Sequence, residues 1–336
     1  MTPDGTPEEL TSRLEAFLER STGGPAVRIS DLRRLTGGAS RETWSLDAAI
    51  GDETLPLILQ HDARAALTPA SRLLEYRLLE AAREAGVPAP EPMFFGDDSL
   101  GGEFFLVRRV DGETLPRRLL REDAYAHTRT VLTSQLGGIL AKIHAIPLTA
   151  PGIETLPAPP AGESPVAHEL ARYEQTFRTL APEPHPAFEL ALRWLGARLP
   201  PPAARRTLVH GDYRMGNVLF DASGVQLILD WELAHAGDPM EDLAWMSVRS
   251  WRFGGDKPVG GIGEREEFFA AYETAGGVQV DPERVRFWEI FGNLRWGIIC
   301  ISQARTYLDG RSDSVELASI GRRTAETEWE LLSLIE

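Results

Sequence analysis

The most informative segment of the sequence is His210-Gly-Asp-Tyr-Arg-Met-Gly-Asn217, which continues as Val218-Leu-Phe-Asp-Ala-Ser-Gly-Val-Gln-Leu-Ile-Leu229 and ends in Asp230-Trp-Glu232. Its middle part contains two short apolar runs, separated by an Asp-Ala-Ser-Gly segment that is typical of a tight turn. The pattern therefore predicts a β-hairpin. Because a hairpin brings its two ends together, we expect Asn217 and Asp230 to be neighbours.

The polar side chains at the ends of this hairpin suit phosphoryl transfer. Asp212 is the candidate general base, because a hydroxyl that attacks a γ-phosphate needs its proton accepted and its oxygen aimed. Asn217 and Asp230 are the candidate ligands of Mg²⁺, which prefers hard oxygen donors. His210 is expected to order the loop from beneath rather than to react. Any one of these residues could merely cap a turn, but the complete arrangement indicates a functional site.

Composition and charge exclude several other classes of protein. The chain has 336 residues, 43% hydrophobic and 25% charged, which is ordinary for a globular protein and long enough for two lobes. Its net charge of −15 argues against nucleic acid as a partner. No stretch approaches the roughly 18 apolar residues of a membrane span, and the acidic N-terminus lacks the hydrophobic core of a signal peptide. We expect a cytoplasmic protein, monomeric or homodimeric, with no membrane partner and a buried, unreactive Cys300.

Hydrophobic periodicity predicts an α+β architecture with two lobes, which we place at residues 1–110 and 111–336. A capping-box pattern at Thr6-Pro-Glu-Glu9 predicts a leading helix over 6–20. Strand-forming residues dominate from Val27 to Val110, with one helix over about 68–85 and a hinge near 109–112. The later segments predicted to be helical lie at about 123–146, 166–180, 187–199, 239–248, 265–275, 282–308 and 315–334.

A glycine-rich turn lies between two of the predicted strands of the first lobe. It consists of Gly37, Gly38, Ala39 and Ser40. Backbone N–H groups in such a turn can surround phosphate oxygens. A simple hairpin turn is the alternative interpretation of the same residues.

Three motifs together resemble one known family. They are His210–Asn217, Asp230-Trp-Glu232 and Gly237-Asp-Pro-Met-Glu-Asp-Leu-Ala-Trp245, and they are similar to those of the aminoglycoside phosphotransferase / choline kinase family. The likeness runs from about Leu35 to Leu308 and is greatest to the branch associated with acyl-CoA dehydrogenases. It implies a bilobal protein-kinase-like fold, with a small antiparallel-sheet lobe and a large helical lobe.

The resemblance also implies roles for individual residues, with ATP or GTP as phosphate donor and Mg²⁺ as the metal. By this likeness Asp212 is the base, and Asn217 and Asp230 bind the metal. Asp242 is a buried Asp that braces the catalytic loop. The residues implied in nucleotide binding are Gly37, Gly38, Ala39, Ser40, Gln60, Glu75, Arg109 and Val110.

The third predicted strand departs from the pattern of the family. There the resemblance implies a Lys or Arg that pairs with Glu75 and neutralises phosphates, but the chain reads Leu57-Ile-Leu-Gln-His61. Gln60 brings no charge, and His61 or Arg64 could substitute from a neighbouring position. A catalytically weak pseudokinase or nucleotide-binding module therefore stays open as an alternative. If the missing cation limits binding, Gln60→Arg should strengthen it.

Tryptophan and arginine side chains follow the predicted metal-binding segment. Arg beside Trp suits an anionic or acyl-bearing ligand, whereas an aminoglycoside would call for a cluster of acids. We therefore favour a hydroxy acid or hydroxyacyl compound as the hydroxyl-bearing acceptor, with an aminoglycoside second. Each of these side chains could also simply pack helices. The candidate acceptor-binding residues are Glu232, His235, Trp245, Arg249, Trp251 and Arg252.

A third class of function is a metal-dependent hydrolase. It would be built from His210, Asp212, Asp230 and His235. Such a site would rely on histidine ligands for a transition metal, and the seven histidines of this chain are mostly scattered along it. The identity of a co-purifying metal would decide this alternative.

Overall fold

The computed structural model describes residues 6–35, 41–62, 71–96, 99–181 and 183–335. The chain divides into two compact units. The first consists of Met1–Gly112, Thr149–Thr155 and Leu227–Glu232, and the second of Glu113–Leu148, Leu156–Gln226 and Leu233–Glu336. The sequence pattern placed the boundary close to Gly112, but it did not indicate that two later segments return to the first unit.

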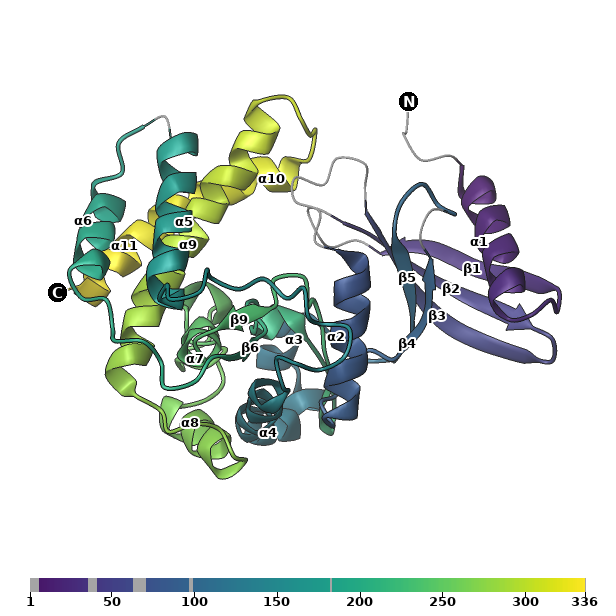
Figure 1. The fold of residues 1–336 in the computed structure, drawn as a ribbon, viewed down its shortest axis with the longest axis horizontal. Helices are drawn as coiled ribbons and strands as arrows, with labels where there is room; N and C mark the ends of the chain where they lie inside the picture. The colour runs from purple at the N-terminus through teal and green to yellow at the C-terminus, as the bar shows by residue number, and fades with distance from the viewer. Residues whose placement is uncertain (1–5, 36–40, 63–70, 97–98, 182, 336) are drawn as a thin grey trace. The chain divides into compact units, whose positions relative to one another are not determined.

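The first unit is a five-stranded antiparallel sheet with two helices (Figure 1), which confirms the predicted strand-rich part. The strands follow the order β1-β2-β3-β5-β4. The elements are α1 (Pro7–Ser21), β1 (Val27–Leu35), β2 (Arg41–Ile50), β3 (Glu53–Asp62), α2 (Arg72–Glu84), β4 (Pro92–Gly96) and β5 (Phe104–Arg108). The capping box of α1 is confirmed, since Thr6 and Glu9 exchange backbone-to-side-chain hydrogen bonds.

The two helices pack against side chains that alternate along the sheet. Phe17 of α1 contacts Phe104 edge-to-face, with ring centroids 4.8 Å apart, in a core that also contains Leu57 and Leu59. Tyr76 of α2 contacts Phe105, the next residue of β5, and their ring centroids lie 6.2 Å apart. Because successive strand residues point to opposite faces, α1 and α2 pack on opposite faces of the sheet.

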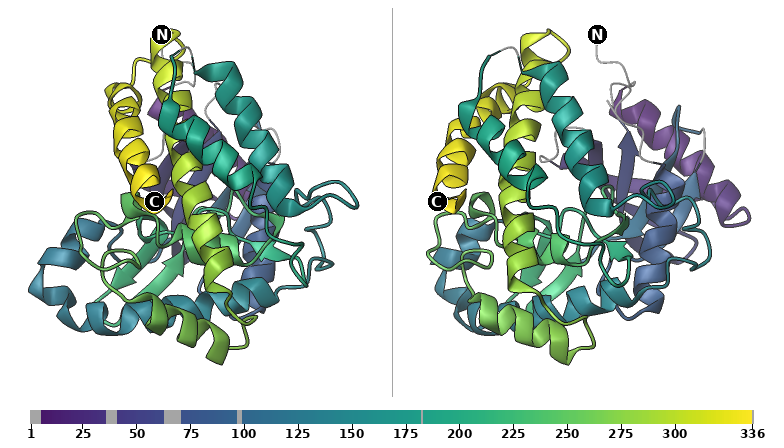
Figure 2. Two further views of the ribbon diagram at one scale, coloured as in Figure 1. Left: turned by 90° about the vertical axis from the view of Figure 1, so that its left-hand side faces the viewer. Right: turned by 60° about the vertical axis from the view of Figure 1, so that its left-hand side comes forward.

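The second unit is mostly helical, and its longest helix, α9, contacts α5, α6, α7, α10 and α11 (Figure 2). Its helices are α3 (Pro116–Arg121), α4 (Ala126–Ala145), α5 (Pro165–Leu180), α6 (Pro186–Gly196), α7 (Met240–Trp245), α8 (Arg265–Thr274), α9 (Pro282–Leu308), α10 (Val315–Ile320) and α11 (Thr324–Ile335). Two short strand pairs follow along the chain: β6 (Thr207–Val209) with β9 (His235–Gly237), and β7 (Val218–Asp221) with β8 (Gly224–Ile228), whose last two residues are assigned to the first unit.

The pairing of β7 with β8 confirms the predicted hairpin, while other expectations are corrected. The strand β9 and the helix α3 lie where no such element was predicted. The last helix is also not continuous, because a short 3-10 segment that begins at Gly321 separates α10 from α11. A Cβ at Gly321 would lie 2.7 Å from the Cβ of Ala304, so glycine permits a close approach to α9 there.

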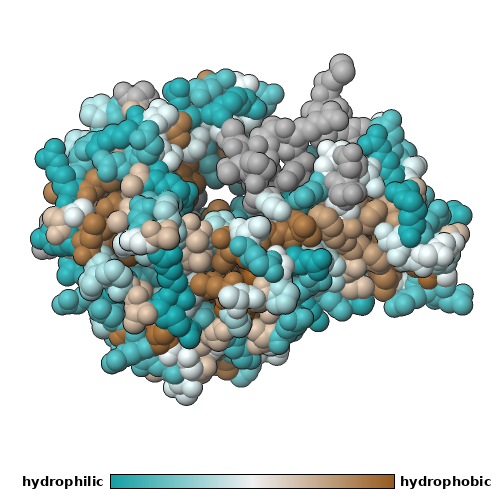
Figure 3. Space-filling view, viewed as in Figure 1, coloured by the Kyte–Doolittle hydropathy of each residue, from teal (hydrophilic) through white to brown (hydrophobic). Residues whose placement is uncertain are grey.

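Three general features of the chain concern its helices, its surface and its single cysteine. In the part of the chain that the structure describes, no helix is both long and apolar enough to cross a lipid bilayer. Hydrophilic and hydrophobic residues are mixed across the face drawn in Figure 3. Cys300 is buried, as expected, and burial raises the pKa of its thiol to about 12.

Candidate active site

The loop over residues 210–217 begins directly after β6 and carries the predicted base. Its conformation depends on glycine at position 211. Gly211 has φ +80, and a Cβ there would lie 2.4 Å from the carbonyl oxygen of Leu233. A side chain at this position would therefore be strained and would also clash with the backbone.

Asp242 of α7 binds the start of this loop from below. Its carboxylate accepts the backbone N–H groups of His210 at 2.7 Å and Gly211 at 2.9 Å, and it also contacts Nε2 of His144 at 3.1 Å. Burial raises the pKa of Asp242, but the hydrogen bond and charge of His144 outweigh burial, so the pKa is lowered. An ionised, fully buried carboxylate thus holds the loop backbone, which is the contact that a brace requires.

The carboxylate of Asp212 receives hydrogen bonds from three side chains. Trp245 Nε1 donates to Oδ1 at 2.8 Å, and Arg214 Nε lies 3.0 Å from both oxygens. Asn217 Nδ2 donates to Oδ2 at 2.6 Å and to the Asp212 carbonyl oxygen at 3.0 Å. His210 Nδ1 accepts the Asp212 backbone N–H at 3.3 Å, a contact within the loop itself. The carboxylate is therefore held in one orientation.

These partners also set the protonation state of Asp212. Burial raises its pKa, but the charge of Arg214 and the hydrogen bonds from Trp245 and Arg214 outweigh burial, and the pKa is lowered. The group is therefore ionised at neutral pH. A pre-oriented carboxylate of this kind can accept a hydrogen bond from an alcohol and take its proton.

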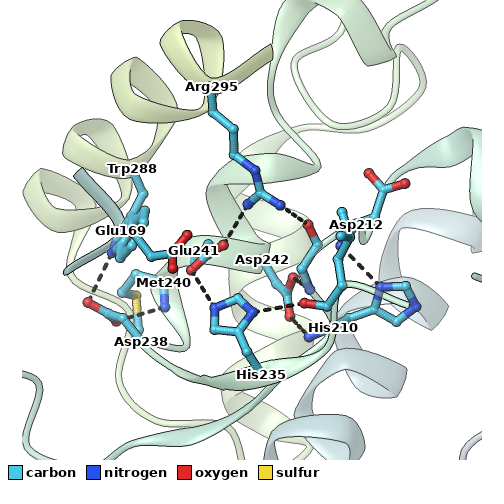
Figure 4. A network of polar contacts seen from close by, with 12 residues as sticks. Glu169, His210, Asp212, His235, Asp238, Met240, Glu241, Asp242, Trp288 and Arg295 are labelled. Carbon is cyan, nitrogen blue, oxygen red and sulfur yellow. Dashed lines mark hydrogen bonds and ion pairs between the residues drawn. The ribbon is translucent and has the colours of Figure 1, made fainter. Parts of the chain in front are cut away.

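Arg295 of α9 connects this loop to α7 (Figure 4). It is 2% exposed, and its guanidinium donates to Glu241 Oε1 at 2.7 Å and to the Gly211 carbonyl oxygen at 3.0 Å. It also lies 4.6 Å from the ring centroid of Trp245. The ring that donates to Asp212 thus rests on a buried cation, which fixes its position.

His235 lies on the other side of Glu241 in the same network (Figure 4). Its Nε2 contacts Glu241 Oε2 at 3.1 Å, and its Nδ1 contacts the Leu233 carbonyl oxygen at 2.9 Å. Burial lowers the pKa of His235, but the charge of Glu241 and a hydrogen bond to it outweigh burial and raise the pKa to about 9. Glu241 is therefore flanked by two cations. Because both ring nitrogens of His235 are engaged, it is poorly placed to ligate a metal, which weakens the hydrolase alternative.

We expect this histidine to make the free energy of unfolding depend on pH. Its pKa of about 9 in the folded state lies above the ordinary value of 6.5. Its contribution is therefore fully present below pH 6.5 and is lost as the pH rises toward 9, by roughly 3 kcal/mol. Urea unfolding at both ends of this range should show that loss in the wild type and not in His235→Gln. Exposed His127→Gln is the control, and an equal loss in His235→Gln would contradict the prediction.

Asp230 and Glu232 follow β8 in the segment that belongs to the first unit. Both side chains are partly buried. The backbone of Asp230 has φ 67, an unusual conformation for a residue other than glycine. Such backbone strain concentrates at functional sites. Asn217 belongs to the second unit and directly precedes β7.

The predicted nucleotide residues have different surroundings. Gly37, Gly38, Ala39 and Ser40 lie outside the described residues. Gln60 is on β3, and Glu75 is buried on α2. Arg109 directs its guanidinium to Asp47 Oδ1 at 2.7 Å and Ser45 Oγ at 2.9 Å, within the first unit. Val110 follows it and is 37% exposed.

Besides His235 and Glu232, the predicted acceptor residues are two tryptophans, which belong to an aromatic cluster, and two arginines, which contact other side chains or backbone. Trp251 lies 5.4 Å from Trp245 and 4.7 Å from Trp296, measured between ring centroids. Arg252 instead donates to the Ser247 carbonyl oxygen at 2.9 Å and contacts Glu289 at 3.5 Å. Arg249 is more than half exposed and lies 3.6 Å from Glu330. Of the predicted acceptor residues, Trp245 therefore contacts the base directly, and Trp251 contacts Trp245.

Two residues beside Asp212 were missed as its partners. Arg214 could have been noticed, since it lies two positions after the base in the same motif. It also covers the ring of Trp251 at 4.7 Å from the centroid. Trp245 was taken for an acceptor contact, and its bond to Asp212 spans 33 positions of the sequence, a pairing that no local pattern signals.

A family model described as the phosphotransferase enzyme family matches residues 31–288. The chain belongs to this family. The match confirms the expected enzyme class and the predicted resemblance.

Relatives and solved structures agree with this assignment. Acyl-CoA dehydrogenase family member 10 of Mus musculus is 26% identical over 94% of this chain, which spans only 30% of that protein. A Ralstonia eutropha protein described as an aminoglycoside phosphotransferase has a similar structure, with 24% identity, TM-score 0.75 and coverage of 96% of this chain and 98% of that one. Aminoglycoside phosphotransferase APH(4)-Ia, solved with AMP-PNP and hygromycin B, has 20% identity, TM-score 0.60 and the same coverage. These structures share the protein-kinase-like fold.

Proposed function

We propose that this protein transfers the γ-phosphoryl group of ATP or GTP to a hydroxyl of a small molecule, with Asp212 as the base. The observation that carries the proposal is the buried, ionised carboxylate of Asp212, oriented by Trp245, Arg214 and Asn217 on a loop held by Asp242. Positioning and electrostatic stabilisation supply most of the catalysis in phosphoryl transfer. The site provides both.

In the proposed reaction the acceptor oxygen forms a bond to the γ-phosphorus. The bond between that phosphorus and the oxygen that bridges to the β-phosphate breaks, and a nucleoside diphosphate leaves. The hydroxyl proton passes to a carboxylate oxygen of Asp212. Because the pKa of Asp212 is lowered, it is a weak base, which suits a transition state in which the proton moves late.

The side chains of Asn217 and Asp230 fit Mg²⁺ as ligands. The Asn217 amide nitrogen is directed to Asp212, which leaves the amide oxygen available for a cation. Asp230 is proposed as the second ligand because it follows the hairpin that begins at Asn217. When bound, the metal would neutralise charge on the phosphates.

In the described part of the chain, no group of three or more His, Cys, Asp or Glu side chains could hold a metal ion.

For the acceptor we propose a hydroxy acid or a hydroxyacyl compound, with an aminoglycoside as the second candidate. The indole N–H groups of Trp251 and Trp296 are buried and have no hydrogen-bond partner among the described residues. Buried tryptophan donors normally find a partner. A ligand with acceptor oxygens would satisfy them, and the carboxylate or acyl oxygens of a hydroxy acid or hydroxyacyl compound are such acceptors. The likeness to acyl-CoA dehydrogenase family members supports the same choice, and the hygromycin B complex of a structural neighbour supports the second.

A screen of acceptors tests the proposal. The protein is incubated with ATP or GTP, MgCl₂ and panels of hydroxy acids, hydroxyacyl-CoAs and aminoglycosides, and nucleoside diphosphate release is measured. We expect turnover with the first two panels, loss of turnover on chelation of the metal, and loss in Asp230→Ala. Turnover of aminoglycosides alone would overturn the acceptor class. An activity that persists without Mg²⁺ would overturn the kinase mechanism.

A further inference from the structure

The first turn of α2 contains a buried ion pair that the sequence pattern did not reveal. Arg72 Nη1 lies 3.0 Å from Glu75 Oε2, and the two side chains are 1% and 4% exposed. Removing two charges from water costs more free energy than a single contact commonly returns, so a buried pair is weak evidence for a role in stability.

Arg72 lies on the same face of the sheet as Gln60, the residue of β3 that stands where the family resemblance implies a Lys or Arg. Its guanidinium lies 6.0 Å from the ring centroid of Phe105 on β5. Phe105 pairs directly with Gln60 across the antiparallel β3–β5 ladder. Residues directly opposed in such a ladder project from the same face of the sheet. Arg72 and the side chain of Gln60 therefore lie on one face, the face on which α2 packs.

The backbone around Arg72 is held in place by its neighbours. Glu103, which directly precedes β5, accepts the N–H groups of Arg72 at 3.0 Å and Leu73 at 3.3 Å. Ser71 caps the helix by accepting the N–H of Leu74 at 3.3 Å. The start of α2 is thus anchored to the start of β5. This anchor fixes the backbone of Arg72 relative to β5, and the contacts of the guanidinium with Glu75 and Phe105 fix the side chain.

The uncharged side chain of Gln60 is compatible with a cation at Arg72. Its Oε1 is buried and has no hydrogen-bond partner among the described residues. A neutral side chain at this position avoids the repulsion that a second cation would suffer beside Arg72. The neutral Gln60 on β3 and the buried cation Arg72 at the start of α2 are therefore explained together: this face of the sheet holds one positive charge, and α2 supplies it.

We propose that Arg72 supplies the positive charge that the third strand lacks, and that it acts on the phosphates of the bound nucleotide while paired with Glu75. In phosphotransferases of the kinase fold, a cation paired with a helix Glu serves these phosphates. Here the cation comes from the helix itself. Its charge is little screened because it is buried. Arg72 is thus a positioning residue for the nucleotide, and the inference rests on the proposed function.

Calorimetric titration with MgATP and MgGTP tests the inference. We expect Arg72→Met to weaken nucleotide binding by about 10- to 100-fold and to leave the KM for the acceptor unchanged. Gln60→Lys in the Arg72→Met background should restore most of the affinity. In the wild-type background the same change should bring no gain, because it places two cations together. Arg77→Met, which removes a half-exposed partner of Glu80 from the same helix, is the matched control.

A variant without either charge separates binding from folding. Arg72→Met/Glu75→Met replaces the pair with apolar side chains, a change that buried pairs often tolerate, and it should fold and still bind nucleotide weakly. Wild-type affinity in Arg72→Met or in this double variant would overturn the inference. So would a gain of affinity from Gln60→Lys in the wild type, or the absence of rescue in Arg72→Met. A wild-type protein that binds no nucleotide would instead contradict the proposed function itself.

Discussion

Asp212→Asn is expected to lower kcat by about 1,000-fold, within the usual range for loss of a general base, while nucleotide binding changes little. Asparagine keeps the size of the side chain and one acceptor oxygen for Trp245. It cannot take up the proton of the acceptor hydroxyl, and it removes the negative charge that aims that hydroxyl. Rates of nucleoside diphosphate release in the presence of the best acceptor measure the effect.

The control for this prediction is Asp221→Asn in the turn of the same hairpin. Asp221 accepts hydrogen bonds from Ser223 near the surface, and its replacement should leave kcat unchanged. If Asp212→Asn keeps more than a tenth of the wild-type rate, Asp212 is not the base. The pseudokinase alternative predicts a different pattern, in which the wild type binds nucleotide and transfers phosphate to no acceptor.

Arg295→Met is expected to lower both stability and turnover. The substitution leaves Glu241 buried with His235 as its remaining charged partner, and loss of one partner of a buried pair costs about 3 kcal/mol or more. It also removes the donor to the Gly211 carbonyl oxygen and the cation beneath Trp245. Asp212 then loses its fixed orientation. Small displacements of catalytic groups can lower kcat by roughly 100-fold.

Urea unfolding and steady-state kinetics measure the two effects of Arg295→Met separately. Arg286→Met is the matched control, because Arg286 is exposed on the same helix and donates to the carbonyl oxygen of Leu334. We expect the control to resemble the wild type in both measurements. A stable Arg295→Met protein with wild-type kcat would contradict the role assigned to this network.

Local sequence signals were sufficient for many elements of the fold. The N-cap at Asp281 and the Pro that follows it begin α9 at Pro282, as the periodicity predicted. The Asp-Ala-Ser-Gly turn gave the β7–β8 hairpin. Each of these features depends on residues within a few positions of one another, because caps and turns are closed by short-range hydrogen bonds. The break at Gly321 was missed, and the close approach of Gly321 to Ala304 of α9 is a contact between residues 17 positions apart that no local pattern signals.

For the candidate site, the motif that carries Asp212, Asn217 and Asp230, and with it the family, can be predicted from the order of residues alone. The surroundings of these side chains are set by tertiary packing. Trp245 beneath Asp212, Arg295 beneath Trp245, and Arg72 on the face of Gln60 all depend on contacts between elements that are distant in the chain. Such contacts are set by how helices and strands pack, and no local pattern in the sequence says which distant residue a given side chain will contact. The reaction class could therefore be predicted from residues close together in the sequence. The charged and aromatic side chains that surround the base and the nucleotide-binding face could be identified only from the folded chain.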